Sequence, residues 1–254
     1  MKIIISPAKK MNMDTDSLAY QDLPVFLFKT EQLYTKLKGM SYDELKALWK
    51  CNDNIAKLNV ERLQQMDLRK NLTPAILSYE GIQYQHMAPG VFTENEFSYI
   101  QEHLRILSGF YGILRPFDGV VPYRLEMQAK LSMTDTKDLY TFWGSTLADH
   151  LTEETDCIIN LASKEYSLSI SKHLPPSIRF ITIIFGEWKD GKIIEKGTIC
   201  KMARGEMVRF LAENQFKKPE ELKSFSRLHY QYSEEHSTDS TYVFLLQEPQ
   251  NKEE

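Results

Sequence analysis

Short apolar runs, interrupted by proline, glycine and polar turns, recur along this chain of 254 residues. The run Lys2–Ile5 is apolar and β-branched and predicts a buried strand, which ends by Pro7 because proline cannot donate to a strand ladder. The run CIINLAS at 157–163 predicts a second buried strand that ends in a polar turn. Two further runs flank Asp190-Gly191, a dipeptide typical of a tight hairpin turn. Strands are therefore predicted at residues 2–5, within 157–163, at 178–188, at 193–200 and at 241–247.

Helical patterns lie between these strands. Ser41 with Glu44, and Thr93 with Glu96, match the capping box, in which two side chains satisfy the first free N–H groups of a helix. After Thr93, an apolar face continues for three turns, so we expect that helix to end at Ser108-Gly109, where glycine can take the left-handed cap conformation. Helices are predicted from 42 to about 50, over 52–66, from 94 to 108, over 139–151, and where Ala203, Met207, Phe210 and Leu211 form an apolar face.

The interleaving of helices and strands, with one antiparallel hairpin, predicts an α/β (or α+β) fold with a mixed sheet. The length is sufficient to bury a full core without disulfides or metal. Hydrophobic residues make up 42% of the chain and charged residues 26%, as in ordinary globular proteins. No shift in composition marks a boundary, so we expect a single domain over residues 1–248 and a polar tail over 249–254.

Composition and spacing argue against several classes of site. The three cysteines are far apart and form no CxxC pair, and the six histidines show no HxH or HExxH spacing, so we assign no metal ligand and no cofactor. The first residues are too short an apolar run for a signal peptide, and no stretch approaches membrane-spanning length, so we expect a cytoplasmic protein without membrane contact. The net charge of −4 means that nucleic-acid binding would require a local basic patch.

The stretch 104–127, LRILSGFYGILRPFDGVVPYRLEM, combines three arginines with glycines, prolines and aromatic residues. Gly109 and Gly112 would close a turn between two short helices, an arrangement similar to a helix–hairpin–helix, whose turn presents backbone N–H groups to a phosphate. Arg105, Arg115 and Arg124 would add charge and paired donors. This interpretation predicts contact with a nucleic-acid backbone, without sequence preference.

The same stretch has a structural alternative. The two glycines of GFYG are separated by two residues, whereas a typical helix–hairpin–helix turn separates them by one. In the alternative, the first glycine caps a helix and the turn is purely structural. Arg115 would then pair with Asp118, and Arg124 with Glu126 or an interior carbonyl. Both interpretations remain open at this point.

A second group of cations lies in residues 196–218, which contain six lysines and arginines against two glutamates. On a helix whose apolar face centres on Met207, Arg209 points outward and Arg204 lies at the edge of the face, where it could reach across a groove. The alternative is a solvated amphipathic helix, because charge runs usually form solvated faces.

Two polar turns follow predicted strands, a common place for binding residues in α/β sheets. In SPAKK, Lys9 and Lys10 could face an anion, or could be plain turn lysines. In NLASKEYS, Ser163, Glu165 and Tyr166 offer a hydroxyl, a carboxylate and a phenol, which together with Lys9 could serve general acid–base catalysis. Ser163 could instead cap a helix by accepting the backbone N–H of Tyr166.

Taken together and in order, six segments resemble the YaaA family of bacterial peroxide-stress proteins: ISPAK, HLRILSGFYGILRPFD, PYRLEM, KDLYTFWG, NLASKEY and KMARGEMVRF. The resemblance covers nearly the whole chain. It implies a cytosolic protein that limits unincorporated iron during hydrogen peroxide stress. It also implies a single α/β domain of unusual topology with a basic cleft and a helix–hairpin–helix element, which binds duplex DNA.

The resemblance supports phosphate contacts by Arg105, Arg115 and Arg124. The leading hypothesis is a DNA-binding surface formed by Lys9, Lys10, Arg105, Gly109, Gly112, Arg115, Arg124, Lys201, Arg204 and Arg209. One position departs from the family pattern. Members usually carry glycine-aspartate-valine-tyrosine where this chain has Gly81-Ile82-Gln83-Tyr84, so an apolar side chain replaces an acid. We therefore assign nothing catalytic to Ile82.

Three functions are compatible with the sequence. The first is a DNA-binding stress protein, with room for a small nucleotide-like ligand. The second is an enzyme that acts on a nucleotide, a nucleobase or a damaged DNA base, with Lys9, Ser163, Glu165 and Tyr166 as the candidate catalytic residues. The third is direct iron sequestration, for which no ligand spacing is present. An enzyme requires these side chains around one pocket, whereas a pure binder requires an open groove of duplex width.

Overall fold

The strand at the start of the chain lies in the middle of the main sheet of the computed structural model, which describes residues 1–247. This strand, β1 (Lys2–Ile5), runs parallel to β5 (Leu104–Ser108) on one side and to β8 (Cys157–Asn160) on the other. Its three isoleucines are fully buried. An apolar run without alternation is typical of a parallel strand that is covered on both faces.

The main sheet is mixed, which confirms the predicted mixed-sheet α/β fold. In the described residues it has eight strands in the order β11-β12-β9-β8-β1-β5-β6, with β10 paired to β9. The strands from β12 to β5 are parallel, and β6, β10 and β11 are added antiparallel. Two small antiparallel pairs, β2-β4 and β3-β7, lie outside it. The remaining strands are β2 (Lys10–Met11), β3 (Thr73–Pro74), β4 (Tyr79–Glu80), β6 (Gly112–Leu114), β7 (Gly119–Val120), β9 (Arg179–Lys189), β10 (Lys192–Ile194), β11 (Tyr230–Tyr232) and β12 (Thr241–Leu246).

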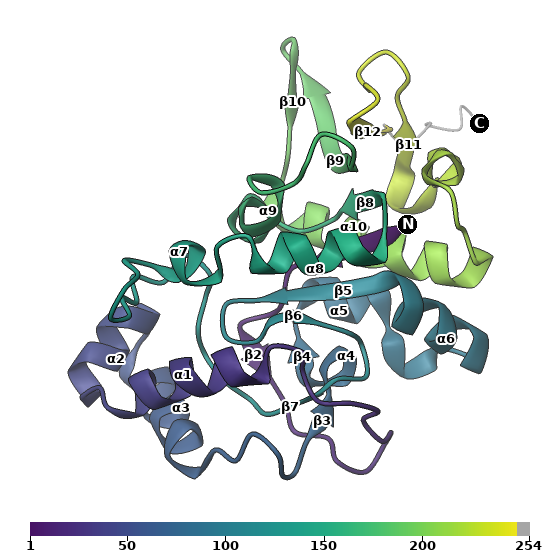
Figure 1. Cartoon of the computed structure of the whole chain (residues 1–254). Helices are drawn as coiled ribbons and strands as arrows, with labels where there is room; N and C mark the ends of the chain where they lie inside the picture. The colour runs from purple at the N-terminus through teal and green to yellow at the C-terminus, as the bar shows by residue number, and fades with distance from the viewer. Residues whose placement is uncertain (248–254) are drawn as a thin grey trace.

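Both predicted capping boxes are confirmed at the starts of α2 and α6. Figure 1 shows α1, α2 and α3 gathered at one end of the molecule, while the β9–β10 hairpin projects at another. The α-helices of the described residues are α1 (Leu27–Lys38), α2 (Tyr42–Trp49), α3 (Asp53–Gln65), α4 (Ala75–Ser78), α5 (Ile82–Met87), α6 (Glu94–His103), α7 (Leu139–Trp143), α8 (Thr146–Glu154), α9 (Lys164–Ser171) and α10 (Gly197–Asn214). Short 3-10 helices occupy Pro89–Val91, Pro219–Ser224 and Arg227–His229.

Two predicted elements have different boundaries in the structure. The helix expected over 139–151 is two helices, α7 and α8, because Gly144 takes a positive φ of 53° and ends the first. The strand expected over 193–200 ends at Ile194, and α10 begins at Gly197. The predicted polar tail, 249–254, lies outside the described residues.

The expected helix–hairpin–helix was wrong. Helix α6 ends at His103, and the next five residues form β5, which turns through residues 109–111 into β6 as a β-hairpin. Strand pairing determines this outcome, because Leu104 pairs with Ile3 of the central strand while the other edge of β5 pairs with β6. Each of the five residues of β5 is buried, so the apolar spacing that resembled a helical face belongs partly to a strand covered on both faces.

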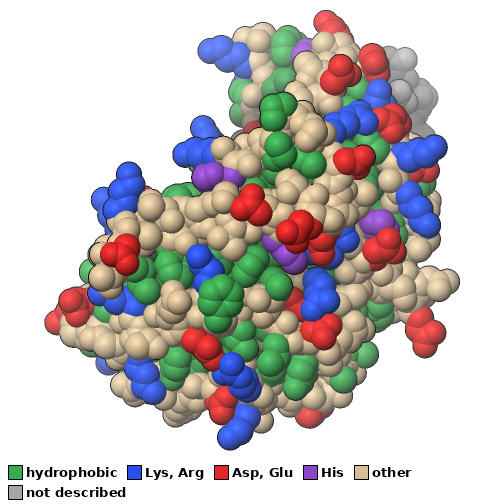
Figure 2. All heavy atoms as spheres, in the orientation of Figure 1, with side chains coloured by type: hydrophobic (Ala, Val, Ile, Leu, Met, Phe, Trp, Pro, Cys, Tyr) green, Lys and Arg blue, Asp and Glu red, His purple; other side chains and the backbone are tan. Residues whose placement is uncertain are grey.

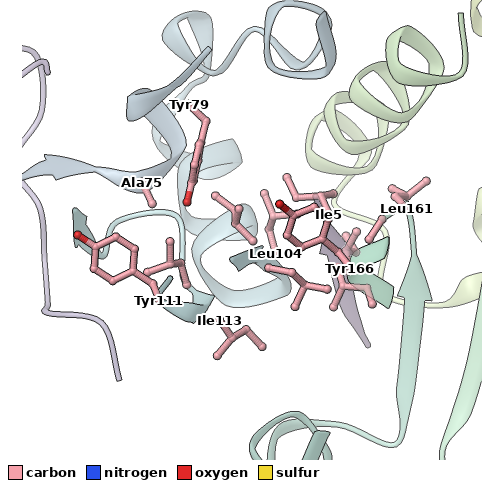
Figure 3. Close-up of a cluster of buried hydrophobic side chains, with 14 of the residues drawn as sticks. Ile5, Ala75, Tyr79, Leu104, Tyr111, Ile113, Leu161 and Tyr166 are labelled. Carbon is pink, nitrogen blue, oxygen red and sulfur yellow. The ribbon is translucent and has the colours of Figure 1, made fainter. Parts of the chain in front are cut away.

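The core is built around this hairpin and the central strands. Trp143, Tyr111 and Phe110 are among its largest fully buried side chains. Figure 3 shows the ring of Tyr166 beside Ile5, within the cluster of buried apolar side chains. The start of α9 is therefore anchored in the core next to the carboxyl end of β1.

On the face shown in Figure 2, acidic and basic side chains are interspersed, and apolar side chains gather over the region of α1. Of the exposed large hydrophobic side chains, six lie between residues 13 and 28: Met13, Leu18, Tyr20, Leu23, Val25 and Phe28. Neither acidic nor basic side chains form an extended patch on the face shown in Figure 2. No helix in residues 1–247 is long and apolar enough to cross a bilayer.

Candidate functional site

The turns that follow β1 and β8 meet at one edge of the main sheet. Because these strands are adjacent and parallel, their carboxyl ends lie side by side, where ligands commonly bind in α/β sheets. The Ser163 N–H donates to Ser6 Oγ at 2.8 Å, and the Ser6 hydroxyl donates to Ser163 Oγ at 3.2 Å. The structure thus brings together SPAKK and NLASKEYS, although Ser6 and Ser163 are 157 positions apart in the sequence.

A cavity of about 440 Å³ opens at this edge, a volume within the range of small-molecule sites. We call it the strand-edge cavity. Its walls come from the turn after β1, from β4 and α5, from the segment after β7, and from the first turns of α9 and α10. Its lining residues are Ser6, Pro7, Ala8, Lys9, Lys10, Glu80, Gly81, Ile82, Gln83, Tyr84, Tyr123, Arg124, Leu125, Glu126, Ser163, Glu165, Tyr166, Lys201 and Arg204.

Local pairing explains why α5 and α10 reach this cavity. Strand β2 pairs with β4, with Lys10 opposite Glu80, so α5 starts beside the SPAKK turn. Helix α10 then packs on α5 at Gly205, where a Cβ would lie 2.1 Å from the Gln83 carbonyl oxygen. Only a residue without a side chain permits this approach, which places the N-terminal turns of α10 over the cavity.

Cationic side chains outnumber carboxylates around the strand-edge cavity, five against three. Lys9 Nζ lies 2.9 Å from Glu126 Oε2, and Arg124 Nη2 lies 3.3 Å from the other oxygen of the same carboxylate. Arg204 Nη2 lies 3.5 Å from the half-exposed carboxylate of Glu195. The single carboxylate of Glu126 thus pairs with both Lys9 and Arg124. The cavity therefore has a local excess of positive charge, although the total charge of the protein is negative.

The other two cations, Lys10 and Lys201, are exposed at the mouth of the cavity. Lys10 forms an ion pair with Glu80 across the β2–β4 pair. Lys201 has no ion-pair partner within residues 1–247. Both ammonium groups therefore face solvent and are accessible to an anionic ligand.

Three buried N–H donors of this cavity have no hydrogen-bond partner among the described residues: Arg124 Nε, Arg204 Nε and Gln83 Nε2. Buried polar groups normally find a partner, and leaving one without costs roughly 1–3 kcal/mol. The three donors belong to residues of three separate segments that line one cavity. The arrangement is suited to a ligand rich in hydrogen-bond acceptors.

Two acid–base groups line the same cavity. Burial raises the pKa of Glu165, and the neighbouring Glu126 carboxylate raises it further, while Lys9 and the Gln128 N–H lower it. The Gln128 N–H donates to Glu165 Oε1 at 3.2 Å. Burial also raises the pKa of Tyr166 well above its usual value, so its phenol stays neutral at physiological pH. Glu165 is thus the better placed of the two to exchange a proton.

Ser163 occupies the N-cap position of α9, but its side chain makes no capping hydrogen bond, so the predicted bond to the Tyr166 N–H was wrong. Instead the Ser163 carbonyl accepts that N–H at 3.0 Å, and the hydroxyl pairs with Ser6. A serine nucleophile requires an adjacent base, and the partner of Ser163 is another hydroxyl. The geometry does not favour Ser163 as a nucleophile.

Other predicted site residues lie away from the strand-edge cavity. Arg105 is only 3% exposed and donates to Glu154 at 2.9 and 2.8 Å and to two backbone carbonyls. Arg115 pairs with Asp118, as the structural alternative predicted, and also with Asp22. The predicted pairing of Arg124 with Glu126 is present as well, inside the cavity.

Gly109, Gly112 and Arg209 are also outside the cavity. Both glycines are buried, and a Cβ at either would collide with the structure packed against it: the Leu125 carbonyl oxygen at 2.6 Å from Gly109 and the Trp143 ring at 2.7 Å from Gly112. Glycine is required at both positions because the hairpin packs closely against Leu125 and Trp143 there. Arg209 forms an ion pair with Glu213 one helical turn away, at 2.8 Å.

Some residues of the cavity carried no signal in the sequence. Gln83 is assigned no role from the sequence, and its neighbour Ile82 is notable there only because it replaces a family acid; both line the cavity. The sequence predicts Glu126 only as a partner for Arg124, whereas it also pairs with Lys9. Within residues 1–247, no group of three or more His, Cys, Asp or Glu side chains is arranged to hold a metal ion.

These features define a mixed-sheet α/β protein with a cavity at the carboxyl edge of its sheet. Cationic residues and residues with unpaired hydrogen-bond donors line this cavity. The sequence model of the family described as "Peroxide stress protein YaaA" matches residues 1–236. The chain is 55% identical to a UPF0246 protein of Agathobacter rectalis, over 96% of this chain and 98% of the relative. It is 56% identical to one of Lachnoclostridium phytofermentans, over 96% of each chain, and 54% identical to one of Pediococcus pentosaceus, over 98% and 99%. The chain belongs to the peroxide stress protein YaaA family.

Proposed function

We propose that this protein acts in the peroxide-stress response by binding duplex DNA, with backbone phosphates held at the mouth of the strand-edge cavity. The observation that supports this most is the pair Arg124 and Arg204. These arginines come from two distant segments, line one cavity, and each keeps a buried Nε–H without a partner in the described residues. Lys9, Lys10 and Lys201 add three further cations around them.

Phosphate fits these donors better than a neutral ligand does. A guanidinium presents a planar set of donors that matches the oxygens of a phosphate, and charge-assisted hydrogen bonds of this kind are about twice as strong as neutral ones. Lysine ammonium groups at the mouth would neutralise flanking phosphates. Such contacts position a nucleic-acid backbone without reading its sequence.

Within this proposal, the limitation of unincorporated iron is an indirect effect of the protein. It would follow from altered gene expression or from protection of iron-containing proteins, rather than from metal binding by the cavity. Less free iron in turn means less oxidative damage to DNA. The DNA-binding step comes first and can be tested alone.

The test is fluorescence anisotropy with a short DNA duplex across a salt series. Each phosphate contacted contributes about 0.9 to the slope of log affinity against log salt. We expect Arg124→Ala and Arg204→Ala each to weaken binding and to reduce that slope by about 1. Arg209→Ala, outside the cavity and paired with Glu213, is the matched control and should bind as the wild type does.

Two outcomes would reject the proposal. The first is that folded wild-type protein does not bind the DNA duplex at low salt, which would mean that this site does not bind DNA. Equal losses in the Arg209→Ala control and the two cavity variants would move the contact surface away from the cavity.

A second candidate function is an enzyme that acts on a nucleotide, a nucleobase or a damaged DNA base. Glu165 favours it, because a carboxyl whose pKa is raised by burial in a ligand-sized cavity is suited to general acid–base work. Wild type and Glu165→Gln would be incubated with nucleotides and with duplexes containing damaged bases, and products separated by mass spectrometry. Turnover by the wild type that Glu165→Gln lacks would support the enzyme; absence of product from every substrate would reject it.

A further inference from the structure

We infer that the strand-edge cavity binds a single nucleoside monophosphate unit, with the base inside and the phosphate against Arg124 and Arg204. This inference rests on the proposed function, since it assumes that the two arginines bind phosphate. It goes further by naming the ligand class that fits the interior. Three observations on the lining residues carry it.

The first observation is that three neutral aromatic side chains form part of the cavity wall. Tyr84, Tyr123 and Tyr166 line the cavity, and all three are buried. Burial raises the pKa of each phenol, that of Tyr123 to about 12, so all three are neutral at physiological pH. The Tyr84 hydroxyl is already engaged, since it donates to the Ser6 carbonyl at 3.1 Å. Neutral aromatic walls favour the flat apolar faces of a nucleobase.

The second observation is Gln83. The residue lines the cavity and is only 7% exposed, and its buried amide nitrogen has no hydrogen-bond partner among the described residues. A carboxamide carries a donor and an acceptor side by side, the combination that pairs with the edge of a base. The close contact of Gly205 with the Gln83 carbonyl fixes this residue between α5 and α10. Gln83 is thus a buried, positioned amide suited to recognition of a base edge.

The third observation is the size of the cavity and the distribution of its charge. About 440 Å³ suits one small ligand and is far too small for a duplex. The cations of Lys10 and Lys201 are exposed at the mouth, whereas the tyrosines and Gln83 are buried. The Arg124 and Arg204 side chains are 11% and 16% exposed, so cationic groups extend from the mouth into the cavity. Aromatic and cationic walls in one cavity match a ligand that joins a flat base to a phosphate.

The same chemistry has two sources, a free nucleotide or an unpaired nucleotide that leaves the stack of bound DNA. Isothermal titration calorimetry would first compare nucleoside 5′-monophosphates with ribose 5-phosphate and inorganic phosphate. We expect at least one monophosphate to bind tenfold or more tightly than ribose 5-phosphate. Arg124→Ala should weaken all three classes, whereas Gln83→Leu should weaken only the nucleotides.

The control for Gln83→Leu is Gln85→Leu, on the same helix but exposed and outside the cavity, which should leave every affinity unchanged. Equal affinity for ribose 5-phosphate and the nucleotides, or no nucleotide binding, would overturn the inference. If duplex binding nevertheless persists and depends on Arg124 and Arg204, the proposed function stands alone. If duplex, nucleotides and phosphate all fail to bind, both proposals fall.

A duplex with a single 2-aminopurine opposite an abasic site separates the two sources. A rise in its fluorescence with wild type, suppressed by Gln83→Leu or by competing nucleotide, identifies a nucleotide drawn from DNA. Unchanged fluorescence together with tight binding of free monophosphates identifies the free nucleotide as the ligand. Either result supports a nucleotide site in the cavity.

Discussion

The Glu126 carboxylate lies 2.9 Å from Lys9 Nζ at the strand-edge cavity, and its other oxygen lies 3.3 Å from Arg124 Nη2. Its position between two cations resembles that of an anionic ligand. A phosphate that binds Arg124 must therefore compete with Glu126, and the carboxylate lowers the net affinity of the site for anions. Glu126 is 19% and Arg124 11% exposed, whereas Lys9 is 64% exposed, so solvent screens mainly the pair with Lys9.

Replacing this internal anion should strengthen DNA binding. We expect Glu126→Gln to raise DNA affinity at least two- to fivefold at low salt. Freeing the exposed Lys9 alone changes the free energy by about 0.5–1 kcal/mol, and the mostly buried Arg124 is freed as well. Anisotropy with the duplex used for the wild type measures the change. Glu213→Gln, which removes the partner of Arg209 outside the cavity, should leave binding unchanged. Weaker binding by Glu126→Gln would mean that the carboxylate positions Lys9 and Arg124 rather than competing with the ligand.

The contact between α5 and α10 depends on Gly205. A Cβ there would lie 2.1 Å from the Gln83 carbonyl oxygen and 2.9 Å from the Met87 nitrogen, so the helices must separate to admit it. We expect Gly205→Ala to lower the free energy of unfolding by roughly 1–3 kcal/mol in urea titration, and to weaken ligand binding by displacing Arg204. Gly197→Ala in the first turn of the same helix meets nothing within 4 Å and should be neutral or slightly stabilising. Equal stability of the two variants would contradict the close packing.

Elements whose signals are local could be predicted from the sequence. The isoleucine run of β1 and the capping boxes of α2 and α6 depend on neighbouring residues, and these elements are present as expected. The strand β5 could not be predicted, since Leu104–Ser108 continues a helical spacing, and only pairing with a strand a hundred residues earlier determines its conformation. Tertiary pairing therefore overrides the local pattern there.

For the candidate site as well, some residues could be predicted from the sequence and others could not. Lys9 and Ser163 follow strand ends, so their position at the sheet edge follows from the sequence pattern and the parallel order of β1 and β8. The arrival of Arg124 and Arg204 at the same cavity depends on how distant segments pack, which a single sequence does not reveal. Arg105 lies outside this cavity and is held by the partly exposed Glu154 carboxylate, an arrangement that has the same sequence signature as an arginine that faces a phosphate.

Arg105 and Glu154 form a mostly buried pair at the edge of β5. Because removal of one partner leaves a buried charge uncompensated, we expect Glu154→Ala to lower the free energy of unfolding by about 3 kcal/mol, measured by urea denaturation. DNA affinity of the folded variant should stay at the wild-type value, since the pair lies outside the strand-edge cavity. A specific loss of DNA binding with unchanged stability would instead return Arg105 to the binding surface.

Asp118 makes the stability of the fold depend on pH. Burial raises its pKa from 3.8 to about 6, although the Arg115 N–H and guanidinium lower it. The folded state therefore holds this proton more tightly than the unfolded chain does. Its stabilising contribution is complete below pH 3.8 and is lost as the pH rises through about 6. The loss across this window amounts to about 3 kcal/mol, since a tenfold difference in proton affinity corresponds to about 1.4 kcal/mol.

Asp118→Asn isolates this contribution, because other carboxyls titrate in the same range and affect both proteins equally. Urea denaturation at intervals between pH 4 and pH 7 gives the unfolding free energy of each protein. The wild-type value minus the variant value should fall as the pH rises, and should level off above the folded-state pKa of about 6. A difference that is constant with pH would show that the ion pair with Arg115 fully offsets burial, so that Asp118 titrates alike in the folded and unfolded chain.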